Sequence, residues 1–215
     1  MTTAPSPRSR IKRQADRADY AAAAVIAILE EGIIAHVGVV GDDGAPVVIP
    51  MGYAVDGTSI LVHGSAASRL MRAYSTVCVT VTILDGLVVA RSLFESSMNY
   101  RSVVAFGVPD VLSGDEKRLA LDILSNRLLP GRVGHAREPS EKEIRATTVW
   151  RISLDEASAK IRVGPPVDDA EDLDLPYWGG VIPLRTSAGS PVGDQLGRPI
   201  ETPDHIDAIV ARFNK

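Results

Sequence analysis

Residues 46–107 read PVVIPMGYAVDGTSILVHGSAASRLMRA, followed directly by YSTVCVTVTILDGLVVARSLFESSMNYRSVVAFG. Four runs within this stretch are rich in valine, isoleucine and threonine, which favour strands. In residues 77–83, valine or isoleucine alternates with cysteine or threonine, the period of two expected for a strand with one buried face. Asp56-Gly57 and Asp85-Gly86 follow such runs and are typical of tight turns. The stretch therefore predicts a series of antiparallel hairpins.

Helices are predicted on either side of this stretch, because apolar residues recur there at spacings of three and four. The fold class is mainly β with flanking helices, in which six antiparallel strands close only partly into a barrel. An incompletely closed barrel leaves an edge that a second copy can cover, so we expect a homodimer. The expected helices cover residues 18–31, 67–74, 114–129 and 203–213, capping boxes are expected at Ser113–Glu116 and Ser140–Glu143, and further strands are expected at 33–40, 147–154 and 157–162.

Three segments are expected along the chain. Residues 1–15 contain two prolines and several basic residues, which indicates a mobile basic arm. Residues 16–164 form the barrel domain, and residues 165–215 form an extension that packs on the barrel or on the dimer interface. The extension includes an acidic run at 168–174, for which a solvated surface is favoured over a metal or partner site.

Composition limits the classes of function. The net charge of −4 and the aromatic content of 5% argue against nucleic acid as a partner. The single cysteine, Cys78, excludes an intrachain disulfide and fits a reducing cytoplasm. No run approaches the roughly 18 apolar residues of a membrane helix, so no membrane partner is expected. The four histidines lack a metal-ligand spacing, and neither the glycine-rich nucleotide motifs nor a serine-nucleophile motif occurs, so no metal is assigned.

Residues 63–69, HGSAASR, are the candidate anion site between two predicted strands. A phosphate group needs several converging donors, and Ser65, Ser68 and Arg69 offer two hydroxyls and a guanidinium. Gly64 would leave backbone amides free at a helix start for the same anion. On spacing alone, a plain strand-to-helix turn with a surface arginine remains the alternative.

The order of several motifs resembles that of a known family. VVIPMGYAVDG, LVHGSAASR, VTILDGLVVARS, SMNYRSVVAFG, ASAKIRVGPP and WGGVIPL follow one another within residues 15–185. This succession is similar to the pyridoxamine 5′-phosphate oxidase-like family of FMN-binding split barrels. More specifically, it resembles the branch of flavin-nucleotide-binding proteins related to nitroimidazole-resistance reductases. The resemblance implies a split barrel and a two-fold dimer that binds FMN at the subunit interface.

The same resemblance implies a set of cofactor-binding residues. A strand containing Val48, Ile49 and Pro50 would run along the flavin ring, and the Ser68–Arg69 pair would hold its phosphate. The opposite subunit would complete the pocket, and an exposed tryptophan that either covers the flavin or packs on the dimer would lie nearby. The remaining residues implied are His63, Gly64 and Ser65 at the entrance, Arg91, Tyr100, Arg101 and Ser102 from the opposite subunit, and Trp178.

The resemblance favours an oxidoreductase in which FMN reduces or oxidises a small-molecule substrate, with Tyr100 or His63 as the candidate proton donor. Leu70 stands where true pyridoxamine phosphate oxidases carry a lysine, and the carboxyl end lacks their tryptophan-and-arginine segment, which argues against vitamin B6 oxidation. The alternative is a non-catalytic dimer that holds FMN or haem for storage, sensing or protection. Deazaflavin is a further cofactor that the fold family accommodates, and a dimer without any ligand is a weaker alternative.

Overall fold

One long strand, β5 (Val77–Val89), forms the centre of the fold in a computed structural model that describes residues 3–41, 43–72, 75–194, 196 and 200–214. It pairs with β6 along almost its whole length and with β2 near its start. The other strands are β1 (Ala18–Asp19), β2 (Ile34–Val40), β3 (Pro46–Asp56), β4 (Ser59–Ser65), β6 (Ser97–Gly107), β7 (Asp110–Val111), β8 (Thr147–Ser153), β9 (Glu156–Arg162) and β10 (Gly180–Pro183). The helices are α1 (Ala22–Glu31), α2 (Gly114–Leu128), α3 (Glu141–Ala146) and α4 (Asp204–Phe213), with 3-10 turns η1 (Ala15–Arg17), η2 (Leu70–Arg72) and η3 (Ala170–Asp172).

The strands form one strongly curved sheet in the order β1-β9-β6-β5-β2-β3-β4-β8-β7, with β10 added to β5. Every strand pair is antiparallel. The predicted class, mainly β and antiparallel with flanking helices, is therefore confirmed. The predicted count of six strands is too low, because the described residues form ten, three of them only two to four residues long. These three short strands leave no period-two pattern in the sequence and account for most of the difference.

The core lies inside the curve of the sheet and is closed by α1. Alternate β5 residues Val77, Val79 and Val81 are fully buried there, as the alternation predicts. From α1, Ile28 and Leu29 join the same cluster. The Tyr53 hydroxyl on β3 donates a hydrogen bond of 2.6 Å to the carbonyl oxygen of Leu29, which ties the helix end to the sheet. Burial of each such aliphatic side chain contributes about 1.5–3 kcal/mol to the free energy of unfolding.

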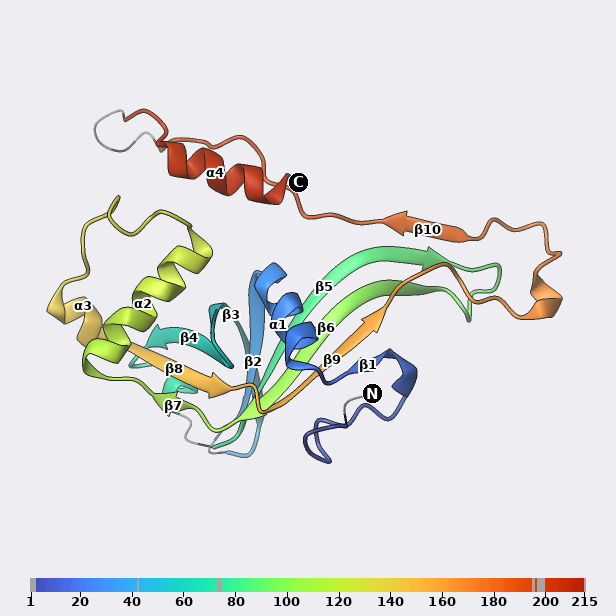
Figure 1. The fold of residues 1–215 in the computed structure, drawn as a ribbon, viewed down its shortest axis with the longest axis horizontal. Helices are drawn as coiled ribbons and strands as arrows, with labels where there is room; N and C mark the ends of the chain where they lie inside the picture. Colours follow the sequence, from blue (N-terminus) through green and yellow to red (C-terminus); the bar gives the residue numbers. More distant parts are fainter. Residues whose placement is uncertain (1–2, 42, 73–74, 195, 197–199, 215) are drawn as a thin grey trace.

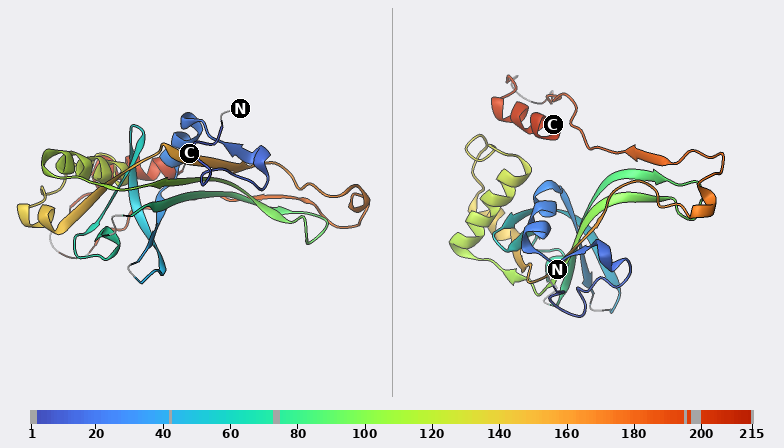
Figure 2. Two further views of the ribbon diagram at one scale, coloured as in Figure 1. Left: turned by 90° about the horizontal axis from the view of Figure 1, so that it is seen from below. Right: turned by 45° about the vertical axis from the view of Figure 1, so that its right-hand side comes forward.

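Beyond the barrel, β5 and β6 continue together as a long arm (Figures 1 and 2). The predicted turn at Asp85-Gly86 is wrong, since β5 runs through it with a bulge between Leu84 and Gly86. Gly86 is not in the left-handed region, whereas Gly57 of the confirmed hairpin turn has φ +58°. A second strand, β10, packs so closely that a Cβ on Gly86 would lie 2.9 Å from the Ile182 carbonyl oxygen. The glycine thus serves a close approach between strands.

The two predicted capping boxes have different outcomes. Ser140 and Glu143 exchange both expected hydrogen bonds at the start of α3, so that box is confirmed. The Ser113 side chain makes no capping bond at the start of α2, and the predicted box there is wrong. Gly114 has φ +53°, so the backbone leaves Ser113 in a direction that does not suit the reciprocal bonds. The predicted helix at 67–74 is reduced to η2, and residues 73–74 lie outside the described residues.

The N-terminal residues contact the outer edge of the sheet. Arg8 forms an ion pair with Glu156 and stacks over the Phe106 ring, with its guanidinium carbon 5.5 Å from the ring centroid. Ser9 is buried, and Lys160 donates to the Arg13 carbonyl oxygen at 3.0 Å. These contacts attach the predicted basic arm to β6 and β9.

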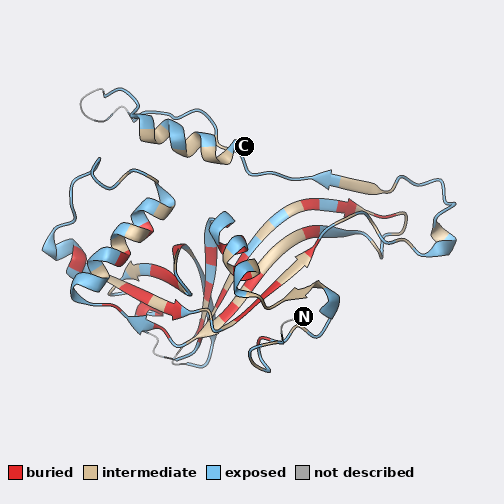
Figure 3. Cartoon of the chain, viewed as in Figure 1, coloured by how far each residue is buried: buried red, intermediate tan, exposed pale blue. Residues whose placement is uncertain are grey.

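The C-terminal extension runs along the arm as β10 and then returns to α2 as α4. Figure 3 shows that α4 has exposed and partly buried residues but no buried ones. Its contacts include a 3.1 Å hydrogen bond from Arg212 to the Arg127 carbonyl oxygen, and its His205 ring lies 4.6 Å from the ring of His135. None of the helices among the described residues is long and apolar enough to span a membrane.

Candidate functional site

β3 and β4 pair for only four residues and then separate. Their pairing ends at Tyr53 and Val62, after which His63–Ser65 of β4 pair with β8 alone. On the other side, residues 46–52 of β3 pair with β2 alone. Between residues 47–51 and residues 63–69, the described strands therefore leave one edge of β3 without a neighbour. We call these two segments the β3–β4 fork.

The β3 branch of the fork offers an exposed apolar surface. Val48 is 62% exposed and lies opposite Gly38 of β2, while Pro50 lies opposite His36. Near them Gly52 has no atom within 4 Å of its Cβ position. Side chains that are small or apolar, next to backbone groups without a strand partner, suit the close approach of a flat ring.

The β4 branch ends in the predicted phosphate loop, whose turn is fixed by its own hydrogen bonds. The Ser65 hydroxyl accepts from the Ala67 amide at 3.2 Å, and the Ser65 carbonyl oxygen accepts from the Ser68 amide at 2.9 Å. The Ala66 amide donates to the Ala146 carbonyl oxygen at 2.9 Å. Three amides that we expected to be free for an anion are thus used within the chain. The Ser68 hydroxyl and the exposed Arg69 guanidinium remain as the donors that can turn to a ligand.

Two further residues hold this loop against β4. A Cβ on Gly64 would lie 2.9 Å from Cγ of Met71, so the glycine lets η2 pack directly on the strand. The exposed Arg72 side chain donates to the Ala66 carbonyl oxygen at 3.4 Å, which links η2 to the turn. Gly64 and Arg72 therefore position the loop, in which Ser68 is half-buried and Arg69 is exposed.

His63 lies at the base of the loop, where β4 leaves β3. Its ring reaches solvent, but the surrounding protein desolvates it enough to lower the pKa of His63 below its ordinary value. A lowered pKa keeps the imidazole neutral at neutral pH, and the neutral ring is the form that accepts a proton or binds a metal ion. The neutral ring suits a metal ligand, whereas the role of proton donor requires that His63 first accept a proton.

The predicted residues from the arm do not meet the fork within one chain. β6, which carries Tyr100, Arg101 and Ser102, is separated from β3 by β5 and β2. The Arg101 guanidinium is held by Asp85, at 2.6 and 2.9 Å, and by Glu31. It therefore has few donors left for a phosphate.

Two more predicted residues lie on the arm itself. The Arg91 guanidinium forms a 2.8 Å ion pair with Asp168, whose carboxylate also accepts from the Arg91 amide at 2.6 Å. This assigns one member of the acidic run 168–174 a structural contact. Trp178 is 64% exposed, and its ring lies over Gly180, where a Cβ would meet it at 2.6 Å.

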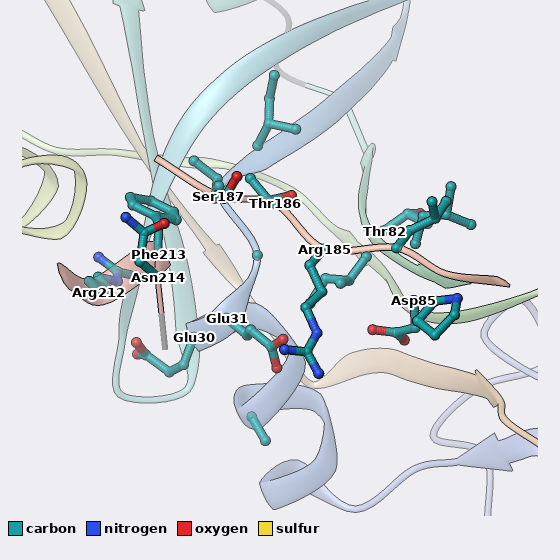
Figure 4. A pocket seen from close by; sticks show the side chains of 18 residues that line it. Glu30, Glu31, Thr82, Asp85, Arg185, Thr186, Ser187, Arg212, Phe213 and Asn214 are labelled. Carbon is teal, nitrogen blue, oxygen red and sulfur yellow. The ribbon is translucent and has the colours of Figure 1, made fainter. Parts of the chain in front are cut away.

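The sequence did not predict a cavity of about 1290 Å³ between the barrel and the C-terminal extension (Figure 4). It opens where β2 and β5 diverge beyond the His36–Thr80 pair. Charged groups at its wall include Glu31, Asp85 and Arg185. The residues that line the cavity come from segments distant in sequence, so only the folded chain brings them together. They lie at the end of α1, the start of β2, the middle of β5, residues 183–187 and the end of α4.

The described residues contain no group of three or more His, Cys, Asp and Glu side chains placed to hold a metal ion. The cavity wall also lacks histidine, cysteine, methionine and tyrosine among its described residues.

Comparison with known proteins identifies the family. The family model described as pyridoxamine 5′-phosphate oxidase matches residues 21–161. The structure of the flavocytochrome Anf3 from Azotobacter vinelandii is 39% identical, with a TM-score of 0.92, and the alignment covers 96% of this chain and 98% of that one. The FAD and haem binding protein from Mycobacterium smegmatis is 35% identical, with a TM-score of 0.85, over 90% of this chain and 97% of that one.

A more distant structure shares the fold alone. It is a candidate 5-nitroimidazole antibiotic resistance protein from Bacteroides thetaiotaomicron, 21% identical with a TM-score of 0.54, over 64% of this chain and 81% of that one. Among curated proteins, no sequence matches. The resemblance drawn from the sequence motifs is confirmed, because the family model covers most of the chain and two similar structures span nearly all of it. The chain belongs to the pyridoxamine 5′-phosphate oxidase family.

Proposed function

We propose that this protein binds a flavin nucleotide at the β3–β4 fork and uses it as a redox protein acting on a small molecule. The observation that carries the proposal is the fork itself. On one side, among the described residues, lies a β3 edge without a strand partner and with an exposed apolar face; on the other lie the half-buried Ser68 and the exposed Arg69. A flavin nucleotide needs both features, since its ring is flat and largely apolar and its phosphate is anionic.

The residues of the fork would have different roles in binding the flavin. Ser68 and Arg69 would hold the phosphate, because a hydroxyl and a guanidinium fork suit a tetrahedral oxyanion. The backbone of residues 47–50 would lie along the ring, and its free N–H and C=O groups would supply polar contacts at the ring edge. A bound flavin would supply electron transfer to or from the substrate. His63, neutral at neutral pH, is the candidate to accept or return the accompanying proton.

We propose FAD in preference to FMN as the flavin. The motif resemblance points to FMN, but a structure 35% identical over most of both chains is described as binding FAD. A flavin released from the purified protein by heat and identified by chromatography would decide between the two. Release of FMN alone would overturn this choice without touching the assignment of a flavoprotein.

We also propose that the protein works as a homodimer. Val40 and Val48 are 59% and 62% exposed on the outer face of β2 and β3, and Ile34 on the same face is 45% exposed. An apolar row of this kind is unusual on a soluble surface unless another chain covers it. A partner docked there could bring its own Tyr100 or Trp178 to the fork. Sedimentation velocity at several concentrations would show a dimer, and a monomer throughout would contradict the proposal.

Haem is a second candidate ligand, alone or beside the flavin. The two most extensively matching structures described above are named as a flavocytochrome and as an FAD and haem binding protein. His63 is the residue of this chain that fits, since its lowered pKa keeps the ring nitrogen available to iron. An absorption spectrum of the purified protein would test both candidates together. Flavin bands, with or without a Soret band, support the proposed function, and the absence of both before and after cofactor addition would refute it.

A further inference from the structure

The base of the arm holds a buried positive charge for which the described residues supply no carboxylate. Arg162, the last residue of β9, is only 7% exposed. Its contact within the described residues is a hydrogen bond to the Asn99 side-chain oxygen, and no Asp or Glu lies within ion-pair distance there. A buried guanidinium without a counter-charge destabilises a protein unless something neutralises it.

The surroundings of Arg162 add positive charge and a phenol. Tyr100 of β6 is its cross-strand partner. Arg17 directly precedes Ala18, which pairs with Lys160 of β9, and its charge acts on Arg162. Desolvation and the charge of Arg17 both lower the pKa of Arg162, while Tyr100 opposes them. Two positively charged side chains and a phenol on adjoining elements favour an anion at this place.

Asn99 holds this arrangement in place. It is 7% exposed, accepts from Arg162 through its side-chain oxygen and donates through its side-chain nitrogen to the Gly164 carbonyl oxygen at 3.0 Å. Among the described residues, these bonds engage Nη1 of Arg162 and leave its Nε and Nη2 without a hydrogen-bond partner. A planar guanidinium held in this way presents two parallel N–H groups, the geometry that binds the oxygens of a phosphate or carboxylate.

We propose that Arg162, Arg17 and Tyr100 form a second anion site, for a phosphate or carboxylate group of a small-molecule ligand. The site lies on β6 and β9, separated from the β3–β4 fork by two strands of the sheet. It does not depend on the flavin assignment, because its two arginines, Arg162 and Arg17, are assigned neither to the fork nor to the partner's contribution to it. Inorganic phosphate and succinate represent its two ligand chemistries.

The test is titration calorimetry of the full-length protein with phosphate and with succinate at constant ionic strength, before and after saturation with FAD. We expect saturable binding of at least one of them, weakened about tenfold or more in Arg162→Gln and in Arg17→Gln. Arg162→Gln keeps a donor for Asn99. Arg17→Gln changes a partly exposed side chain and carries the test if the first variant does not fold.

Two control variants separate this site from other arginines. Arg118→Gln removes an exposed arginine paired with Glu141, and it should bind the anion as the unchanged protein does. Arg69→Gln alters the fork, so anion binding that survives in Arg69→Gln but not in Arg162→Gln belongs to the second site. Absence of binding to both anions would overturn the proposal, and so would equal binding by Arg162→Gln, Arg17→Gln and the unchanged protein.

A second measurement excludes a merely structural role. If Arg162 serves an anion, its replacement by glutamine should not lower the melting temperature in chloride buffer, because a buried charge is removed. The rise in melting temperature that the bound anion gives should then be lost. An equal fall in melting temperature in both buffers, with the anion response intact, would contradict the site.

Discussion

Tyr53 and Val62 are the last residues at which β3 and β4 pair, and the candidate flavin site begins where they part. Tyr53 is also fixed from the other side, since its hydroxyl donates to the Leu29 carbonyl oxygen at 2.6 Å. The point of divergence is thus anchored to α1. This anchor keeps the two branches of the fork at a defined separation.

The Tyr53 anchor predicts the effect of Tyr53→Phe. Loss of its hydroxyl should lower the free energy of unfolding by about 1 kcal/mol, at the low end for a buried hydrogen bond. The low end applies because Arg127 also donates to the Leu29 carbonyl oxygen, at 3.2 Å. Denaturant unfolding measures the change. Tyr177→Phe, an exposed tyrosine, is the matched control and should leave stability unchanged.

The dependence of stability on alkaline pH tests the Tyr53 hydrogen bond independently. Burial raises the pKa of Tyr53 to about 12 from an ordinary value of 10.0. The protonated phenol is favoured in the folded state, so its contribution is fully present below pH 10.0 and is lost as the pH rises through about 12. Stability of the unchanged protein should therefore fall more steeply over this range than that of Tyr53→Phe. Parallel curves would show that the hydroxyl carries no such linkage.

The close approach of β10 to Gly86 predicts that Gly86→Ala will locally open the C-terminal extension. In Gly86→Ala, the new methyl group would meet the Ile182 carbonyl oxygen at 2.9 Å and Val181 Cγ1 at 3.1 Å, both in β10. Such overpacking costs about 1–3 kcal/mol and should be relieved by loosening β10 from β5. Hydrogen exchange should accelerate at the Leu184 amide, which donates to the Asp85 carbonyl oxygen at 3.0 Å.

Gly189→Ala provides the control for this change. No atom lies within 4 Å of a Cβ at that position, so exchange at the Leu184 amide should be unaffected. Unchanged exchange in Gly86→Ala would mean that β10 can shift without separating from β5.

The two Asp-Gly pairs show what sequence can and cannot predict here. Both follow runs rich in β-branched residues, and both were expected to be turns. Gly57 adopts the left-handed conformation and closes the β3–β4 hairpin, whereas Gly86 stays in an extended strand. The difference comes from pairing with β6 on one side and β10, about a hundred residues later in the chain, on the other. Local propensity contains no information about such distant partners.

The candidate site could likewise be predicted only in part from the sequence. The Ser68–Arg69 loop and the strand at residues 47–50 were predicted, because turn chemistry and alternation are local. The fork that sets them opposite each other depends on the register at which β4 exchanges β3 for β8, which only the fold determines. Arg101 was expected at the flavin, yet Asp85 and Glu31, both distant in sequence, occupy its guanidinium. Nothing in the sequence pattern indicates that Asp85 and Glu31 pair with Arg101.

His63→Ala should separate the two cofactors. Removal of the imidazole takes away the candidate iron ligand, so a Soret band present in the unchanged protein should be lost while flavin bands persist. The measurement is one absorption spectrum of each protein at equal concentration. His135→Ala, a histidine beside α4 and away from the fork, is the control and should keep both sets of bands. A Soret band that survives in His63→Ala would remove this residue as the ligand.

The central claim is that the fork holds the phosphate of a flavin, and flavin titration of Arg69→Gln tests it most directly. A charge-assisted hydrogen bond to phosphate contributes about 1.5–3 kcal/mol, so affinity should fall roughly ten- to hundredfold. Arg118→Gln, which changes an exposed arginine on α2, should bind as the unchanged protein does. Loss of affinity confined to Arg69→Gln is the predicted result. Equal affinity in both variants and the unchanged protein would place the flavin elsewhere and contradict the account.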